Sequence, residues 1–155
     1  MYQILVSACL VGRPVRYDGS GKALSNPIWL KWQAQQRLLP ICPEVVGGLA
    51  TPRAAAERQP DGRIMTTEGA DVTSQFHRGA TLSLAQAIQS NVAFAVLKAN
   101  SPSCGNQQVY DGNFAGRLIE GQGVTAALLS EAGFKVFNEH QLEQAEVYLE
   151  QLERV

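Results

Sequence analysis

The chain has 155 residues, of which 45% are apolar and 17% are charged. This composition is typical of a folded, soluble protein and excludes an intrinsically disordered chain. We expect one domain over residues 1–155, because this length is enough to bury a self-sufficient hydrophobic core. The net charge of −1 excludes the overall basic surface that non-specific nucleic-acid binding requires.

No apolar run approaches the length of a transmembrane helix, so we expect no membrane association. The segment Val6 to Cys9 has the form of a lipoprotein cleavage site, but only eight residues precede Cys9 and they form no basic region. A signal peptide needs a longer apolar segment with a basic start. We therefore interpret this segment as part of a first strand and expect a cytoplasmic protein.

The first half of the chain alternates between predicted strands and helices. Gln3 to Ala8 is an apolar run that predicts a strand, and the Gly- and Pro-rich stretch Cys9 to Gly21 predicts a loop. Ser25 to Leu38 predicts a helix, with a Ser or Asn cap and a proline in its first turn. Leu38 to Cys42 then predicts a second strand that leads into a turn at Pro43 to Gly48.

The middle of the chain contains a long polar excursion. We expect a short hairpin within Leu49 to Asp71, with Gly62 to Thr66 as one arm. Asp71 to about Asn91 predicts a helix, and Val92 to Leu97 predicts a third, buried strand. This strand ends at Lys98 to Gly105, where a proline and a glycine shape a loop around a cysteine.

The last third of the chain predicts a turn, a mobile stretch, a helix, a strand and a final helix. Tyr110 to Phe114 predicts the turn, and we expect the glycine-containing stretch after it to be mobile. Thr125 to Ala132 predicts a helix that ends before a glycine. Phe134 to Phe137 predicts a fourth strand, and Glu139 to Glu153 an amphipathic helix. The residues expected on the buried side of this helix are Leu142, Ala145, Val147, Tyr148 and Leu152.

Strands that alternate with helices indicate an α/β fold with right-handed crossovers. We expect a Rossmann-like, three-layer domain with a short, mainly parallel sheet of about four strands. Ligands of such sheets bind outside the carboxyl ends of the strands. The loops that bear the cysteines follow three of these ends, so we expect the cysteines to surround one crevice.

The chain contains three cysteines, Cys9, Cys42 and Cys104, and an odd number is unsuited to a disulfide framework. Their residue types and positions leave three interpretations open. The first is a zinc ion with three thiolates and an open position, although paired C-x-x-C spacing is missing. The second is an iron–sulfur cluster in which one iron lacks a protein thiolate. The third is metal-free chemistry, with Cys104 as the nucleophile and another cysteine resolving it.

Three segments resemble the signature blocks of the thiouracil desulfidase (TudS-like) family, formerly a bacterial domain of unknown function. They are Ser7 to Gly19, Cys42 to Arg53 and Leu97 to Gly105. The resemblance extends over nearly the whole chain. It implies a [4Fe-4S] cluster held by the three cysteines, with one open iron. It also implies removal of sulfur from 2-thiouracil or a related thiolated nucleobase.

The resemblance assigns the catalytic acid/base role to Glu44 and an active-site role to Ser101. The chemistry agrees, because desulfurising a thiocarbonyl requires a sulfur acceptor, an activated water and a proton shuttle. Glu44 follows Cys42 by two residues on the same loop, within reach of such a water. The alternatives are a solvated loop carboxylate for Glu44 and a turn hydroxyl that bonds nearby backbone for Ser101.

Further candidates for substrate binding flank the cysteines. They would line the pocket or compensate the negative charge of the cluster, although surface salt bridges explain neighbouring arginines and carboxylates equally well. Ser103 is expected to bond the backbone or a cluster sulfide. The full set of these candidates is Arg16, Tyr17, Asp18, Arg53 and Ser103, and Glu57 follows the second segment in a similar position.

The leading hypothesis is therefore a [4Fe-4S]-dependent desulfidase of thiolated pyrimidines such as 2-thiouracil, 4-thiouracil or 4-thiouridine. The alternatives are a non-catalytic iron–sulfur module and a metal-free cysteine-dependent hydrolase or transferase. A near-neutral chain favours a small-molecule substrate over thiolated tRNA. Thiolated tRNA stays open as an alternative, because the arginines could form a local basic patch. The sequence leaves both a monomer and a homodimer open.

Overall fold

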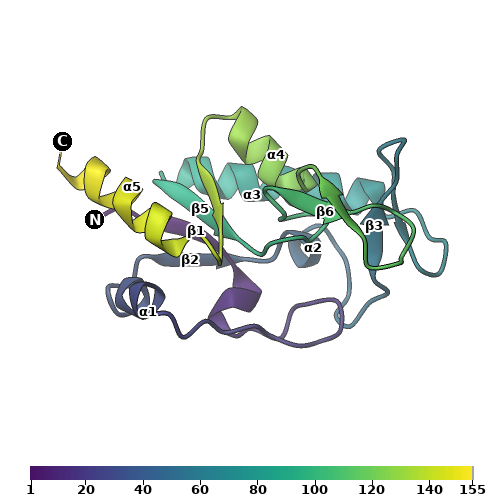
Figure 1. Ribbon diagram of the computed structural model, residues 1–155, viewed down its shortest axis with the longest axis horizontal. Coiled ribbons are helices and arrows are strands. Elements are labelled where there is room, and N and C mark those ends of the chain that lie inside the picture. The colour runs from purple at the N-terminus through teal and green to yellow at the C-terminus, as the bar shows by residue number, and fades with distance from the viewer. Residues whose placement is uncertain (155) are drawn as a thin grey trace.

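The computed structural model describes residues 1–154 and shows a parallel sheet between two layers of helices (Figure 1). The sheet contains four parallel strands in the order β2-β1-β5-β8. These strands are β1 (Ile4–Ser7), β2 (Leu38–Ile41), β5 (Phe94–Leu97) and β8 (Val136–Asn138). The predicted α/β class and parallel sheet are confirmed.

Each face of the sheet is covered by a pair of helices. One pair is α1 (Pro27–Ala34) with α5 (Leu142–Glu153), and the other is α3 (Thr73–Gln89) with α4 (Val124–Glu131). Side chains along β1 alternate between the two faces, because successive residues of a strand point to opposite sides. Ile4 and Val6 belong to the core beneath α1 and α5, whereas Leu5 belongs to the core beneath α3 and α4.

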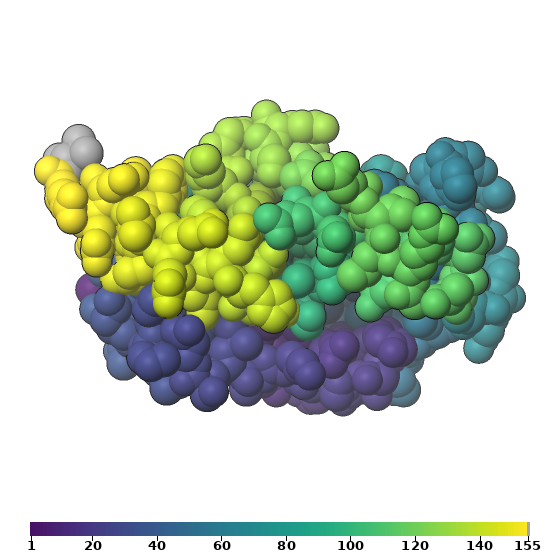
Figure 2. Space-filling view, viewed as in Figure 1, coloured from purple at the N-terminus to yellow at the C-terminus, as the bar shows by residue number. Residues whose placement is uncertain are grey.

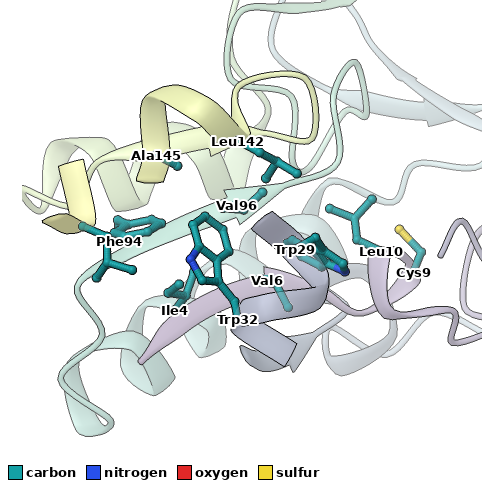
Figure 3. Close-up of a cluster of buried hydrophobic side chains, with 11 residues drawn as sticks. Ile4, Val6, Cys9, Leu10, Trp29, Trp32, Phe94, Val96, Leu142 and Ala145 are labelled. Atoms are coloured by element: carbon teal, nitrogen blue, oxygen red, sulfur yellow. The ribbon is translucent and has the colours of Figure 1, made fainter. Parts of the chain in front are cut away.

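Aromatic side chains dominate the core beneath α1 and α5 (Figure 3). The tryptophans Trp29 and Trp32 are fully buried. The ring of Trp32 meets that of Phe94 edge-on at 5.9 Å between centroids, and its Nε1 donates to Glu146 of α5 at 2.6 Å. Such edge-to-face contacts contribute about 0.5–1.5 kcal/mol beyond the buried area. The hydrogen bond from Trp32 to Glu146 joins α1 to α5, and the two helices form one layer.

Two antiparallel hairpins extend the molecule beyond the sheet. The predicted one pairs β3 (Ala56–Arg58) with β4 (Ile64–Thr66). The second pairs β6 (Gln108–Tyr110) with β7 (Leu118–Glu120), so part of the stretch after Phe114 that was expected to be mobile forms a strand. The ladder between β6 and β7 satisfies the backbone groups of this stretch and continues in a bond from Asp111 N to Arg117 O.

A second difference concerns the segment after β2. The predicted turn there forms a short helix, α2 (Pro43–Val46). Pro43 occupies the first helical position, where the missing N–H of proline costs no hydrogen bond. A one-turn 3-10 helix, η1 (Ala8–Val11), likewise begins the loop after β1. None of the helices within residues 1–154 is both long and apolar enough to cross a membrane.

Candidate functional site

The three cysteines lie just beyond the carboxyl ends of three adjacent strands. Cys9 belongs to η1 after β1, Cys42 is the N-cap residue of α2 after β2, and Cys104 lies on the loop after β5. In the strand order β2-β1-β5, the chain passes from β1 to opposite sides of the sheet. The crevice at such a reversal is the usual ligand-binding position of α/β sheets. All three thiols line one cavity of about 450 Å³, as the predicted fold requires.

Two glycines bring α2 into direct backbone contact with α3. A Cβ on Gly79 of α3 would overlap the carbonyl oxygen of Pro43, and a Cβ on Gly47 would overlap the carbonyl oxygen of Gln75. Because α2 begins immediately after Cys42 and contains Glu44, this contact determines the position of both side chains.

Hydrogen bonds shape the loop that carries Cys104. The Oγ of Ser101 accepts from the backbone N–H of Cys104 at 2.8 Å and from that of Ser103 at 3.1 Å. The turn-hydroxyl interpretation of Ser101 is therefore confirmed. Within residues 1–154 its own O–H hydrogen has no acceptor, and Ser101 lines the cavity. At the start of the loop, the N–H of Lys98 donates to Ser7 Oγ at 2.8 Å, which ties the end of β5 to the end of β1.

Burial favours the neutral form of all three thiols. It raises the pKa of Cys9 to about 11 and that of Cys104 to about 12, and the charge of Cys42 is a further cause of both increases. It also raises the pKa of Cys42. Lys98 opposes the shift of the Cys9 pKa. At neutral pH these sulfurs become thiolates only if a strong positive charge, such as that of bound iron, is added.

This donor set fits an iron–sulfur cluster. Thiolate is the soft ligand that such clusters select, and ligands from separate loops are usual for them. Among residues 1–154, no group of three or more His, Cys, Asp or Glu side chains converges closely enough to hold a single metal ion. A cluster has several irons at separate corners, so it requires no such convergence on one point.

Glu44 is held by one of its two carboxylate oxygens. Arg53 Nε donates to Glu44 Oε1 at 3.1 Å, and the other nitrogens of Arg53 bind Val15 O, Ala50 O and Thr51 Oγ1. No donor within residues 1–154 bonds Glu44 Oε2, and Glu44 lines the cavity. Burial raises the pKa of Glu44, although the Arg53 charge opposes this shift.

The cavity brings together most but not all of the residues predicted for the site. Asp18 lies outside the lining and accepts hydrogen bonds from the backbone and hydroxyl of Ser20. Ser103 also lies outside it, fully buried, with its Oγ 2.8 Å from Thr125 Oγ1. The predicted residues that line the cavity are Cys9, Arg16, Tyr17, Cys42, Glu44, Arg53, Ser101 and Cys104.

The far wall of the cavity comes from Glu57, which was expected near the pocket, and from two residues that the sequence reasoning missed, Tyr110 and Phe114. Tyr110 and Phe114 reach it from the β6–β7 hairpin, and Glu57 reaches it from β3. Figure 2 shows the loop after β1, in purple, below this green hairpin, with a crease between them. The Asp111-Gly112 turn signal between the apolar pairs Val109-Tyr110 and Leu118-Ile119 was the sequence feature that could have predicted the hairpin.

The fold and the cavity define a doubly wound α/β protein with three thiols and a buried carboxylate at its topological switch point. The model of the 2-thiouracil desulfurase family matches residues 4–141. The chain therefore belongs to the 2-thiouracil desulfurase family, a family of enzymes, and the resemblance of the three sequence segments is confirmed.

Two similar proteins extend this match over almost the whole chain. The chain is 43% identical over 148 residues to YbbK of Bacillus subtilis (strain 168), a protein described as uncharacterized, covering 90% of this chain and 97% of YbbK. It is 45% identical to a solved structure of the [4Fe-4S]-dependent thiouracil desulfidase TudS, with a TM-score of 0.94. That match covers 97% of this chain and 99% of the other.

Proposed function

We propose that this chain is a cytoplasmic, single-domain desulfidase that depends on a [4Fe-4S] cluster and removes sulfur from a thiolated pyrimidine. The observation that carries the proposal is the meeting of three thiols, a carboxylate and a hydroxyl in one cavity. Cys9, Cys42 and Cys104 would hold the cluster. A cluster with three protein thiolates supplies one iron with an open position, a Lewis acid for a thiocarbonyl sulfur.

The side chains divide the remaining chemistry. Glu44, fixed through Oε1 by Arg53, presents Oε2 to take a proton from water or return one to a ring nitrogen. Ser101, whose Oγ already accepts two backbone N–H groups, donates its own hydrogen to orient the substrate or the water. In the overall hydrolysis the carbon–sulfur bond breaks, oxygen from water takes the place of sulfur, and sulfur leaves as sulfide.

The cavity volume of about 450 Å³ falls in the range of small-molecule sites. A free base or a nucleoside such as 2-thiouracil, 4-thiouracil or 4-thiouridine is therefore the proposed substrate, in preference to thiolated tRNA. The raised pKa values of Cys9 and Cys104 argue against a metal-free thiol mechanism, since the thiolate is the nucleophilic form.

The test is anaerobic iron and sulfide analysis of the wild type beside Cys9→Ala, Cys42→Ala and Cys104→Ala, with sulfide release measured from each of the three substrates. We expect a four-iron cluster and sulfide release in the wild type, and loss of both in each variant. A wild type that holds the cluster but releases no sulfide would indicate a non-catalytic module. Full activity after removal of iron would instead indicate a thiol-based hydrolase.

A further inference from the structure

Glu57 is a buried carboxylate in the cavity wall that the proposed mechanism leaves unused. It lies on β3, is 9% exposed and lines the same cavity as the three cysteines. None of the lysines, arginines and histidines within residues 1–154 forms an ion pair with it. A buried carboxylate without a cationic partner requires hydrogen-bond donors instead.

Only one of its two oxygens meets such donors. Glu57 Oε1 accepts from the backbone N–H of Gly112 at 3.0 Å and from that of Phe114 at 3.1 Å. Among the described residues, no donor bonds Oε2. Within residues 1–154, Trp29 Nε1 is the one side-chain polar atom that is fully buried and lacks a partner. Because Glu57 Oε2 also lacks a partner, it is not fully buried. Glu57 therefore holds the β6–β7 turn with Oε1, and Oε2 is left without a protein donor in a side chain that lines the cavity.

The surroundings of this acceptor suit a flat ring. Phe114, whose N–H Glu57 binds, is 38% exposed, and Tyr17 from the loop after β1 is 44% exposed. Both aromatic side chains line the cavity. Half-exposed aromatic groups beside one directed polar atom are the usual composition of a site for a planar heterocycle.

We propose that Glu57 Oε2 accepts a hydrogen bond from the ring N–H next to the thiocarbonyl carbon of the substrate. This inference rests on the proposed function, because 2-thiouracil, 4-thiouracil and 4-thiouridine all carry an N3–H group beside the reacting carbon. Glu57 is thus a specificity-determining residue that selects pyrimidines with a free N3–H and orients the C–S bond. A ring that is methylated at N3 cannot donate and would meet the carboxylate with its methyl group.

The variant Glu57→Gln separates this role from the structural one. The amide oxygen of glutamine can keep the two bonds to the turn, which places its NH₂ group, a donor, where the wild type has an acceptor. We expect KM for 4-thiouracil to rise about 10- to 100-fold, while the visible absorption of the cluster stays unchanged. KM for 3-methyl-4-thiouracil should change much less, so the discrimination between the two substrates should fall.

Two further variants and a binding measurement complete the test. Glu120→Gln, an exposed position on β7 of the same turn-forming hairpin, serves as the control and should match the wild type. Calorimetry of the cluster-loaded protein with uracil should show weaker binding in Glu57→Gln. If Glu57→Gln matches the wild type in both measurements and only Glu57→Ala is impaired, Glu57 merely anchors the hairpin and the inference is overturned.

The outcomes also separate this inference from the proposed function. Turnover of 4-thiouracil by the wild type, with no effect of Glu57→Gln, overturns the role of Glu57 alone. Absence of turnover in the wild type overturns the proposed function, and uracil calorimetry then decides the inference. A wild type that binds no uracil overturns it, whereas binding that Glu57→Gln weakens supports a pyrimidine site at Glu57.

Discussion

Replacing Gly79 by alanine tests whether the contact between α2 and α3 positions the side chains that we propose for catalysis and cluster binding. A Cβ at this position would overlap the backbone carbonyl of Pro43. A backbone carbonyl cannot rotate away as a flexible side chain can, so α2 has to move off α3. Cys42 and Glu44, which lie at the start of α2, would move with it.

Two opposing effects set the size of the change in stability. Overpacking costs typically about 1–3 kcal/mol, whereas alanine is better than glycine in a helix by about 1 kcal/mol. Because the added Cβ overlaps backbone atoms of Pro43 and not a flexible side chain, we place the cost toward the upper end and expect a net loss of about 1–2 kcal/mol. With a urea m-value of about 2 kcal/mol/M, the unfolding midpoint falls by roughly 0.5–1 M.

The assay is urea unfolding of the iron-free protein, followed by iron analysis after anaerobic reconstitution. Arg78→Ala is the matched control, because Arg78 is an exposed neighbour on the same helix and alanine there meets no such overlap. We expect Gly79→Ala to lose both stability and iron relative to this control. Equal stability and equal iron content in Gly79→Ala and Arg78→Ala would refute the reasoning.

Three other predictions concern the polar groups around the cavity. Arg53→Lys should lower kcat for sulfide release about 10- to 100-fold, because one ammonium cannot bind Glu44 and the loop carbonyls as the guanidinium does. Arg63→Lys, at an exposed ion pair, should leave kcat unchanged, and an equal effect of both variants would contradict this assignment. In the iron-free protein, the pKa of about 11 for Cys9 predicts alkylation by iodoacetamide at about pH 8 roughly 100-fold slower than for a free thiol. Because burial favours the neutral thiols of Cys9 and Cys104, stability should be greatest below their ordinary pKa of 9.0 and fall as pH rises toward about 11 to 12. Rapid alkylation at pH 8, or stability that increases with pH over this window, would show that these thiols are not buried.

The position of the cysteines could be predicted because strong local signals precede each of them. Short apolar strands end at glycine- and proline-rich loops, and crossover rules then align their carboxyl ends. No detail of side-chain packing is needed for this step. Cys9, Cys42 and Cys104 therefore meet at one edge in the structure, as they do in the expected fold.

The far wall of the cavity depends on tertiary contacts that a local pattern does not contain. The strands β6 and β7 have only three residues each, too few for a period of two to show. Glu57 is buried because the turn at Gly112 docks on it from 55 positions away in the chain. Helical spacing also overestimates burial, since the predicted core residue Val147 of α5 is 54% exposed whereas Leu149 is buried.

The loops around the cysteines are joined by groups other than the sulfurs. The Lys98 N–H bonds Ser7 Oγ and so joins the ends of β5 and β1. Arg53 bonds Val15 O and so joins the loop after β1 to the segment after α2. These bonds remain when a cysteine becomes alanine, so each Cys→Ala variant should keep the fold while losing the cluster. Its iron-free form should unfold within about 1–2 kcal/mol of the iron-free wild type. A variant such as Gly79→Ala, by contrast, should lose stability and iron together, because it disturbs the arrangement of the elements that carry the ligands.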